Sequence, residues 1–139
     1  MKSPLIYLCS KFAKWIPSLF VFFTVLLILL TLTPGDLIVN KIPNGSDKLS
    51  HATFFYIWTM LFWMAVKINN YTKNLPMWMI FITASLLGLT IEILQYLLPV
   101  DRGMELYDIL ANTVGICFGL ICIWYMKHKK VVEQIIMHG

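Results

Sequence analysis

Four long apolar runs, separated by short polar segments, dominate the chain. A helix needs about 20 predominantly apolar residues to cross the hydrocarbon core of a bilayer. The runs therefore predict four transmembrane helices, over residues 15–33, 49–66, 75–98 and 107–126. Because the connections are short, consecutive helices are expected to lie antiparallel in a four-helix bundle. The predicted fold is an all-α membrane protein with a single domain over residues 1–139.

Composition and the distribution of basic residues support a membrane protein and predict its orientation. The 139 residues are 59% hydrophobic and 13% charged, with a formal net charge of +4 and a mean hydropathy of +0.76, well above the soluble average. Basic residues flank the apolar runs, so no nucleic-acid partner is predicted. Eight of the 11 Lys and Arg residues lie before the first run, between the second and third, or after the fourth. Only Lys41, Lys48 and Arg102 lie on the other side, so both termini are expected in the cytoplasm.

Strongly polar residues of the apolar runs are concentrated at the ends that would face outward. One group lies at the start of the second run, and another extends from the end of the third run to the start of the fourth. Ionisable groups are costly inside a bilayer and therefore indicate a functional site. The sequence predicts an outward-facing polar pocket whose ligand-binding residues are Asp47, Lys48, His51, Glu92, Gln95, Arg102, Asp108 and Asn112.

Helical spacing places these polar residues on single faces of their helices. They recur at steps of three and four residues along the third and fourth runs, and Asp47 and His51 are also four residues apart. Glycines lie on the same faces, and small residues let transmembrane helices approach closely. The predicted helix-packing positions are Gly88, Gly115 and Gly119.

Several of the polar residues also have a purely structural interpretation. An acidic side chain in the first turn of a helix is stabilised by the helix dipole, which would explain Asp47 and Asp108. Amide side chains such as Gln95 and Asn112 are typical of hydrogen bonds between transmembrane helices. His51 fits a simple hydrogen bond to a neighbour better than a metal ligand.

Glu92 is the residue that a structural role explains least. A carboxylate in an apolar helix needs a partner or a proton. Arg102, the only Arg in the chain, is its predicted partner, because a guanidinium can clamp a carboxylate or phosphate. A metal bound by His51, Glu92 and Asp108 is an alternative, but one His with two carboxylates is a loose signature. The three cysteines have no metal or redox spacing, so neither a metal nor a cofactor is predicted.

Three motifs in fixed order resemble the VanZ-like family of small bacterial membrane proteins. They are D-K-x-x-H from Asp47, G-x-x-x-E-x-x-Q-x-x-x-P from Gly88, and R-x-x-E-x-x-D-x-x-x-N-x-x-G-x-x-x-G from Arg102. The resemblance implies a multi-pass protein of the bacterial plasma (inner) membrane, related to an accessory factor for resistance to the glycopeptide teicoplanin. Asp101 stands where the family often has Gly, and Glu105 where Asp is frequent. An acid beside Arg102 weakens the anion-clamp role expected of the guanidinium.

Different functions remain open for the predicted pocket. The favoured one is a binding or accessory role in the cell envelope, with membrane lipids as partners and a cell-wall precursor or glycopeptide headgroup as the ligand. An enzyme acting on a lipid-linked substrate is an alternative in which Glu92 and His51 or Asp108 serve as acid and base. A second alternative is a proton-linked transporter. A third is a purely structural role, in which the polar network only fixes the register of the helices. The oligomeric state is left open.

Overall fold

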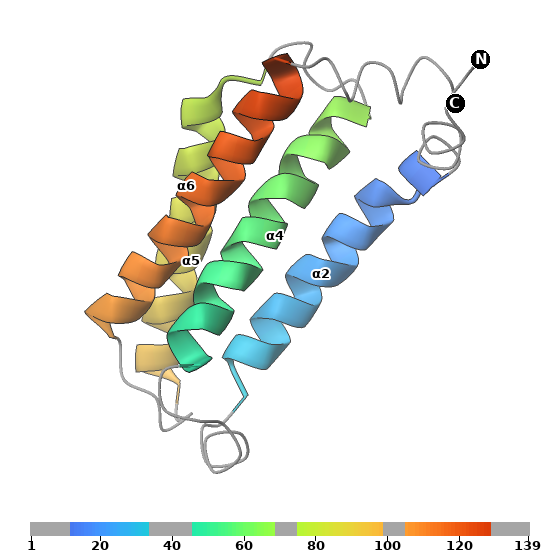
Figure 1. The fold of residues 1–139 in the computed structure, drawn as a ribbon. Helices are drawn as coiled ribbons and strands as arrows, with labels where there is room; N and C mark the ends of the chain where they lie inside the picture. Colours follow the sequence, from blue (N-terminus) through green and yellow to red (C-terminus); the bar gives the residue numbers. More distant parts are fainter. Residues whose placement is uncertain (1–11, 34–45, 69–74, 99–104, 129–139) are drawn as a thin grey trace, which may run out of the picture.

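The computed structural model describes residues 12–33, 46–68, 75–98 and 105–128, and this part of the chain contains helices and no strands. Its helices are α2 (Ile16–Thr31), α4 (Ser46–Ile68), α5 (Met77–Leu97) and α6 (Leu106–His128), shown in Figure 1. Their ends differ from the predicted spans by at most three residues. The all-α prediction is therefore confirmed for the described residues.

Three of these helices, α4, α5 and α6, are long and apolar enough to cross a membrane. The remaining helix, α2, is also apolar but has only 16 residues. Its length is about 24 Å by the rise of an α-helix, which is less than the hydrocarbon thickness of about 30 Å. Pro17 lies in its first turn, a position that proline tolerates, and Leu32 caps its other end. The first predicted span, 15–33, is thus a shorter helix than expected.

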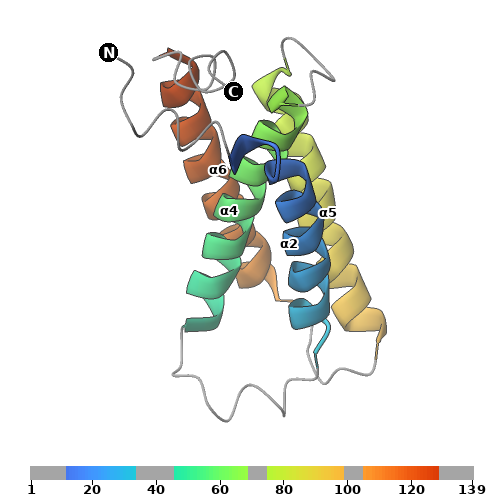
Figure 2. The same cartoon turned by 90° about the vertical axis from the view of Figure 1, so that its right-hand side faces the viewer.

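Consecutive helices run in opposite directions, and α4 occupies the centre of the bundle (Figure 1). Its most extensive contact is with α6, and it also packs against α2 and α5. Helix α5 packs mainly against α6 and makes only a small contact with α2. Turning the molecule shows that α2 and α5 lie on one side of the bundle (Figure 2). Neighbours in space are therefore not always neighbours in sequence.

Glycines on α6 explain why it approaches α4 so closely. A methyl group added to Gly115 would overlap the backbone carbonyl of Ala52. A methyl group added to Gly119 would come within 2.9 Å of the Thr59 side chain. Small residues therefore bring the two helix backbones together, as is usual in lipid. Gly88 of α5 faces α4 in a similar way, since a methyl group added there would lie 3.2 Å from the ring of Phe55.

Two apolar clusters fill the interior of the bundle. The larger one gathers buried side chains from all four described helices: Leu27, Phe55, Trp58, Ala84, Ile91 and Ile116. The smaller one, Trp63, Ile80 and Ile123, lies toward the opposite end from the polar residues discussed below. The Trp58 indole nitrogen donates a 3.0 Å hydrogen bond to the Thr24 hydroxyl, which joins α4 to α2. Large apolar side chains on the outer faces are exposed, such as Phe22, Leu86 and Phe118, and this perimeter suits a hydrocarbon environment.

Candidate functional site

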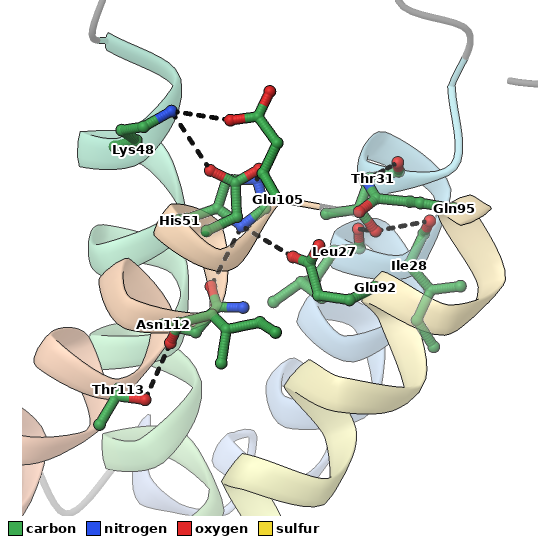
Figure 3. A network of polar contacts seen from close by, with 12 residues as sticks. Leu27, Ile28, Thr31, Lys48, His51, Glu92, Gln95, Glu105, Asn112 and Thr113 are labelled. Atoms are coloured by element: carbon green, nitrogen blue, oxygen red, sulfur yellow. Dashed lines mark hydrogen bonds and ion pairs between the residues drawn. The ribbon is translucent and has the colours of Figure 1, made fainter. Parts of the chain in front are cut away.

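The polar residues gather where four helix ends meet. The C-terminal ends of α2 and α5 and the N-terminal ends of α4 and α6 lie at this end of the bundle (Figure 3). The buried members of the group are Thr31, His51, Glu92, Gln95, Asp108 and Asn112. Residues more than 50 positions apart in sequence are thus brought into one layer, as the hydrogen bond between Lys48 and Glu105 illustrates.

His51 is the centre of this layer and connects three helices. Its Nδ1 atom lies 3.1 Å from Oδ1 of Asn112 on α6. The same nitrogen lies 4.0 Å from Oε1 of Glu92 on α5. The other ring nitrogen, Nε2, lies 3.8 Å from Oδ2 of Asp108. The imidazole therefore has a carboxylate near each of its two nitrogens, and Figure 3 shows it pointing toward Glu92 and Asn112.

Glu92 is buried without a hydrogen bond. Its side chain has 0% exposure, and neither carboxylate oxygen has a hydrogen-bond partner among the described residues. His51 is its ion-pair partner in this part of the chain, with Nδ1 4.0 Å from Oε1. Arg102, the partner predicted from the sequence, lies outside the described residues. A buried carboxylate with so few partners is costly, because burial in a low dielectric penalises its charge.

The rim of the site is exposed, and Lys48 at this rim is paired with acidic side chains. Lys48 Nζ lies 3.1 Å from Oε2 of Glu105 and 3.6 Å from Oδ1 of Asp108. The side chains of Lys48 and Glu105 are 42% and 56% exposed, whereas that of Asp108 is only 9% exposed. Asp47 is exposed at the start of α4, and one of its carboxylate oxygens lies within 4.8 Å of ligand atoms of His51 and Asp108, in agreement with its spacing from His51. Sequence reasoning had not included Glu105 in the site, and only its place in the R-x-x-E motif pointed to it.

Gln95 has a different role from its neighbours. Its Nε2 atom donates a 2.6 Å hydrogen bond to the backbone carbonyl of Thr31. The last carbonyls of a helix have no partner within that helix, so Gln95 satisfies one at the end of α2. This contact attaches α2 to α5 where the two helices otherwise touch little. Thr31 is a buried polar residue that sequence reasoning missed, because a threonine in an apolar run gives no distinguishing signal.

The structure therefore divides the predicted site residues into separate groups. Five of them form one contiguous set: Lys48, His51, Glu92, Asp108 and Asn112. Gln95 lies beside this set but bonds to α2, Asp47 adjoins the set from the exposed rim, and Arg102 is outside the described residues. The described acids outnumber the bases, since Asp47, Glu92, Glu105 and Asp108 surround only Lys48 and His51.

A cavity of about 430 Å³ lies away from this layer, between α4 and the second half of α6. Its lining is apolar and includes Tyr56, Met60 and Ile121. The Tyr56 hydroxyl donates to Cys122 Sγ at 3.6 Å within this region. The cavity therefore does not correspond to the polar pocket that the sequence predicts.

Comparison with known proteins identifies one family. A sequence model of the VanZ/LLP1 family matches residues 5–127, which include every residue of the site described above. No curated protein and no solved structure matches the chain. The match extends well beyond the three motifs and confirms the resemblance that they indicated.

Proposed function

The chain belongs to the VanZ/LLP1 family, and on this premise we propose that it is a cell-envelope membrane protein that binds a polar headgroup. The binding site in this proposal is the outward end of the bundle, around His51, Glu92 and Asp108. The headgroup comes from a cell-wall precursor, a membrane lipid or a glycopeptide antibiotic, and binding contributes to tolerance of teicoplanin. The membrane in question is the bacterial plasma membrane.

The observation that supports this proposal is the surplus of carboxylates in a partly buried layer. Ionisable groups inside a membrane protein are costly and mark ligand or ion sites. Lys48 is engaged by Glu105 and Asp108, so it is a weak candidate for capturing an anion. The remaining acids favour a headgroup that offers an amino group and other hydrogen-bond donors. The exposed rim of Asp47, Lys48 and Glu105 provides the side from which such a headgroup approaches.

The orientation on which this proposal depends is testable with cysteines at the two ends of α6. In a cysteine-free background, Leu106→Cys is expected to react with a membrane-impermeant maleimide in intact cells. His128→Cys, at the other end of the same helix, is expected to react only after the cells are permeabilised. Both positions are exposed, so access across the membrane is the difference between them. The opposite labelling pattern would place the polar layer in the cytoplasm and exclude an outward site.

The binding role is tested by teicoplanin susceptibility of a sensitive Gram-positive host. Expression of the wild type is expected to protect the host, and Glu92→Gln and Asp108→Asn are expected to lose that protection completely. Both variants keep the side-chain size and remove the charge, so the effect reports the carboxylates. Ile93→Ala is the matched control, because Ile93 is next to Glu92 but exposed on the outer face of α5. The comparison requires equal amounts of each protein in the membrane.

Equal susceptibility of the wild type and both carboxylate variants would contradict the proposed role. Loss of protection by Ile93→Ala would also contradict it, because the phenotype would then follow bundle packing and not the polar layer.

A second candidate function is an enzyme that acts on a lipid-linked substrate. The supporting observation is an imidazole held between two buried carboxylates, Glu92 and Asp108. Groups of this kind serve as general acid and base when they reach a substrate atom. Turnover of a labelled lipid-linked substrate by the purified protein, abolished by Glu92→Gln, would favour this function over simple binding.

A further inference from the structure

We propose that Asp47, His51 and Asp108 form a binding site for a divalent transition-metal ion. Each of these residues offers one ligand atom, and these atoms all lie within 4.8 Å of one another. Asp47 and His51 are one helical turn apart on α4, and Asp108 is in the first turn of α6. The metal site shares His51 and Asp108 with the proposed headgroup site, but its test is separate, because metal binding is measured on purified protein without a lipid or antibiotic.

The hydrogen bonding of the imidazole supports a metal on its Nε2 side. Nδ1 lies 3.1 Å from Oδ1 of Asn112, an acceptor, so Nδ1 carries the hydrogen and donates it. A neutral imidazole with its hydrogen on Nδ1 has its lone pair on Nε2, and this atom faces Oδ2 of Asp108. Metal-binding histidines usually donate their second ring hydrogen to an amide or carboxylate oxygen in this way. Asn112 and Glu92 therefore occupy the positions of outer-shell partners.

The distance between Nε2 and Asp108 also suits a shared cation. At 3.8 Å it is too long for a direct hydrogen bond. Zinc bonds of about 2.0–2.2 Å to imidazole nitrogen and carboxylate oxygen place two ligand atoms about 3–4 Å apart. His51 and Asp108 are buried, whereas Asp47 is exposed, and its ligand atom lies within 4.8 Å of theirs.

Unsatisfied buried carboxylates are a second, independent observation. Both oxygens of Glu92 and Oδ1 of Asp108 have no hydrogen-bond partner among the described residues, and the two side chains are at least nine-tenths buried. Lys48 approaches Asp108 from the Oδ1 side, at 3.6 Å. Oδ2 faces His51 instead and is available to a metal. A divalent cation would offset the negative charge of this layer, which Lys48 only partly offsets.

The donor set limits the kind of ion. One imidazole nitrogen and two carboxylate oxygens suit Zn²⁺ or Mn²⁺, whereas Cu⁺ prefers sulfur ligands. The described cysteines, Cys117 and Cys122, lie farther along α6 and outside the set. Three protein ligands leave at least one position for water or another oxygen ligand, as in catalytic zinc sites.

The experiment measures Co²⁺ binding to the full-length protein, purified in detergent and treated with a chelator. Cobalt is a spectroscopic substitute for zinc, and one Co²⁺ per chain is expected, with a d–d absorption band that Zn²⁺ abolishes by displacement. Removal of any one ligand is expected to weaken binding by at least about tenfold, as tested with Asp47→Asn, His51→Gln and Asp108→Asn. Asn112→Leu is expected to weaken it by about 10–100-fold, the usual effect of losing an outer-shell partner. Zn²⁺ is also expected to raise the thermal unfolding temperature of the wild type but not that of Asp108→Asn.

His128→Asn is the control, because His128 stacks on Trp124 at the other end of α6. This variant is expected to leave Co²⁺ binding unchanged. Asp47→Asn alters an exposed side chain, so its result does not depend on the folding of a buried variant. Absence of stoichiometric Co²⁺ binding by the wild type would overturn the proposal. The proposal would also be overturned if Asp47→Asn kept full affinity for Co²⁺. It would be overturned as well if His128→Asn lost as much affinity as Asp108→Asn.

Discussion

His51→Leu is expected to lower the free energy of unfolding by about 3–5 kcal/mol, the usual cost of removing one partner from a buried charged pair. His51 lies between Glu92 and Asp108 and is 5% exposed. Leucine has a similar volume but offers no charge or donor to either carboxylate. The measurement is denaturant unfolding in mixed micelles, followed by circular dichroism in the presence of a chelator so that no metal contributes.

A double-mutant cycle separates this electrostatic effect from a packing defect. His51→Leu with Glu92→Leu is expected to recover most of the lost stability, because the second change removes the carboxylate that the first leaves without its partner. Glu92→Leu alone is also expected to destabilise the protein, since it removes one partner of the buried pair and leaves the other, whereas replacing both partners is often neutral. Strictly additive losses would mean that the two side chains do not interact, and the central role of His51 would be wrong.

Gly115→Ala is expected to destabilise the protein by about 3 kcal/mol, the upper part of the range for overpacked sites. The added methyl group would overlap the Ala52 backbone carbonyl, which cannot move without displacing α4 from α6. The sign of this prediction is informative. In a helix with free space, replacing glycine by alanine would instead stabilise by about 1 kcal/mol through helix propensity.

Two comparisons make the glycine result specific. Gly119→Ala is expected to destabilise less, because its methyl group would lie 2.9 Å from the Thr59 side chain and 3.4 Å from the nearest backbone carbonyl, that of Tyr56. Val114→Ala changes a residue next to Gly115 that is exposed on the outer face, so unfolding in micelles should shift little. A stabilising effect of Gly115→Ala would show that α4 and α6 are farther apart than the structure indicates.

The sequence alone predicted much of the fold because the bilayer imposes a length on each helix. The apolar runs ended within three residues of the observed helices, and the steps of three and four between polar positions indicated which residues share a face. Their concentration at the outward ends of the runs also placed His51, Glu92 and Asp108 in one layer. These are local properties, since they depend only on the composition and spacing of each segment.

Contacts between helices could not be obtained in the same way. Spacing put Asp47 and His51 on one face, yet only His51 is buried, because the first turn of α4 lies at the rim. The spacing left Gln95 either in the pocket or in a hydrogen bond between helices, and only the structure shows that its amide bonds to the end of α2. The spacing of polar residues also gave no indication that Lys48 would pair with Glu105 across the rim.

The sequence by itself determined the membrane class, the helices and the depth of the polar residues, and it carried the motifs that indicate the family. Only the tertiary structure decided that α4 packs most extensively on α6, and that His51 lies between Asn112, Glu92 and Asp108. The physical reason is that helix rotation and neighbour order depend on close approach between distant segments, here at Gly115 and Gly119. The spacing within one helix does not specify that approach.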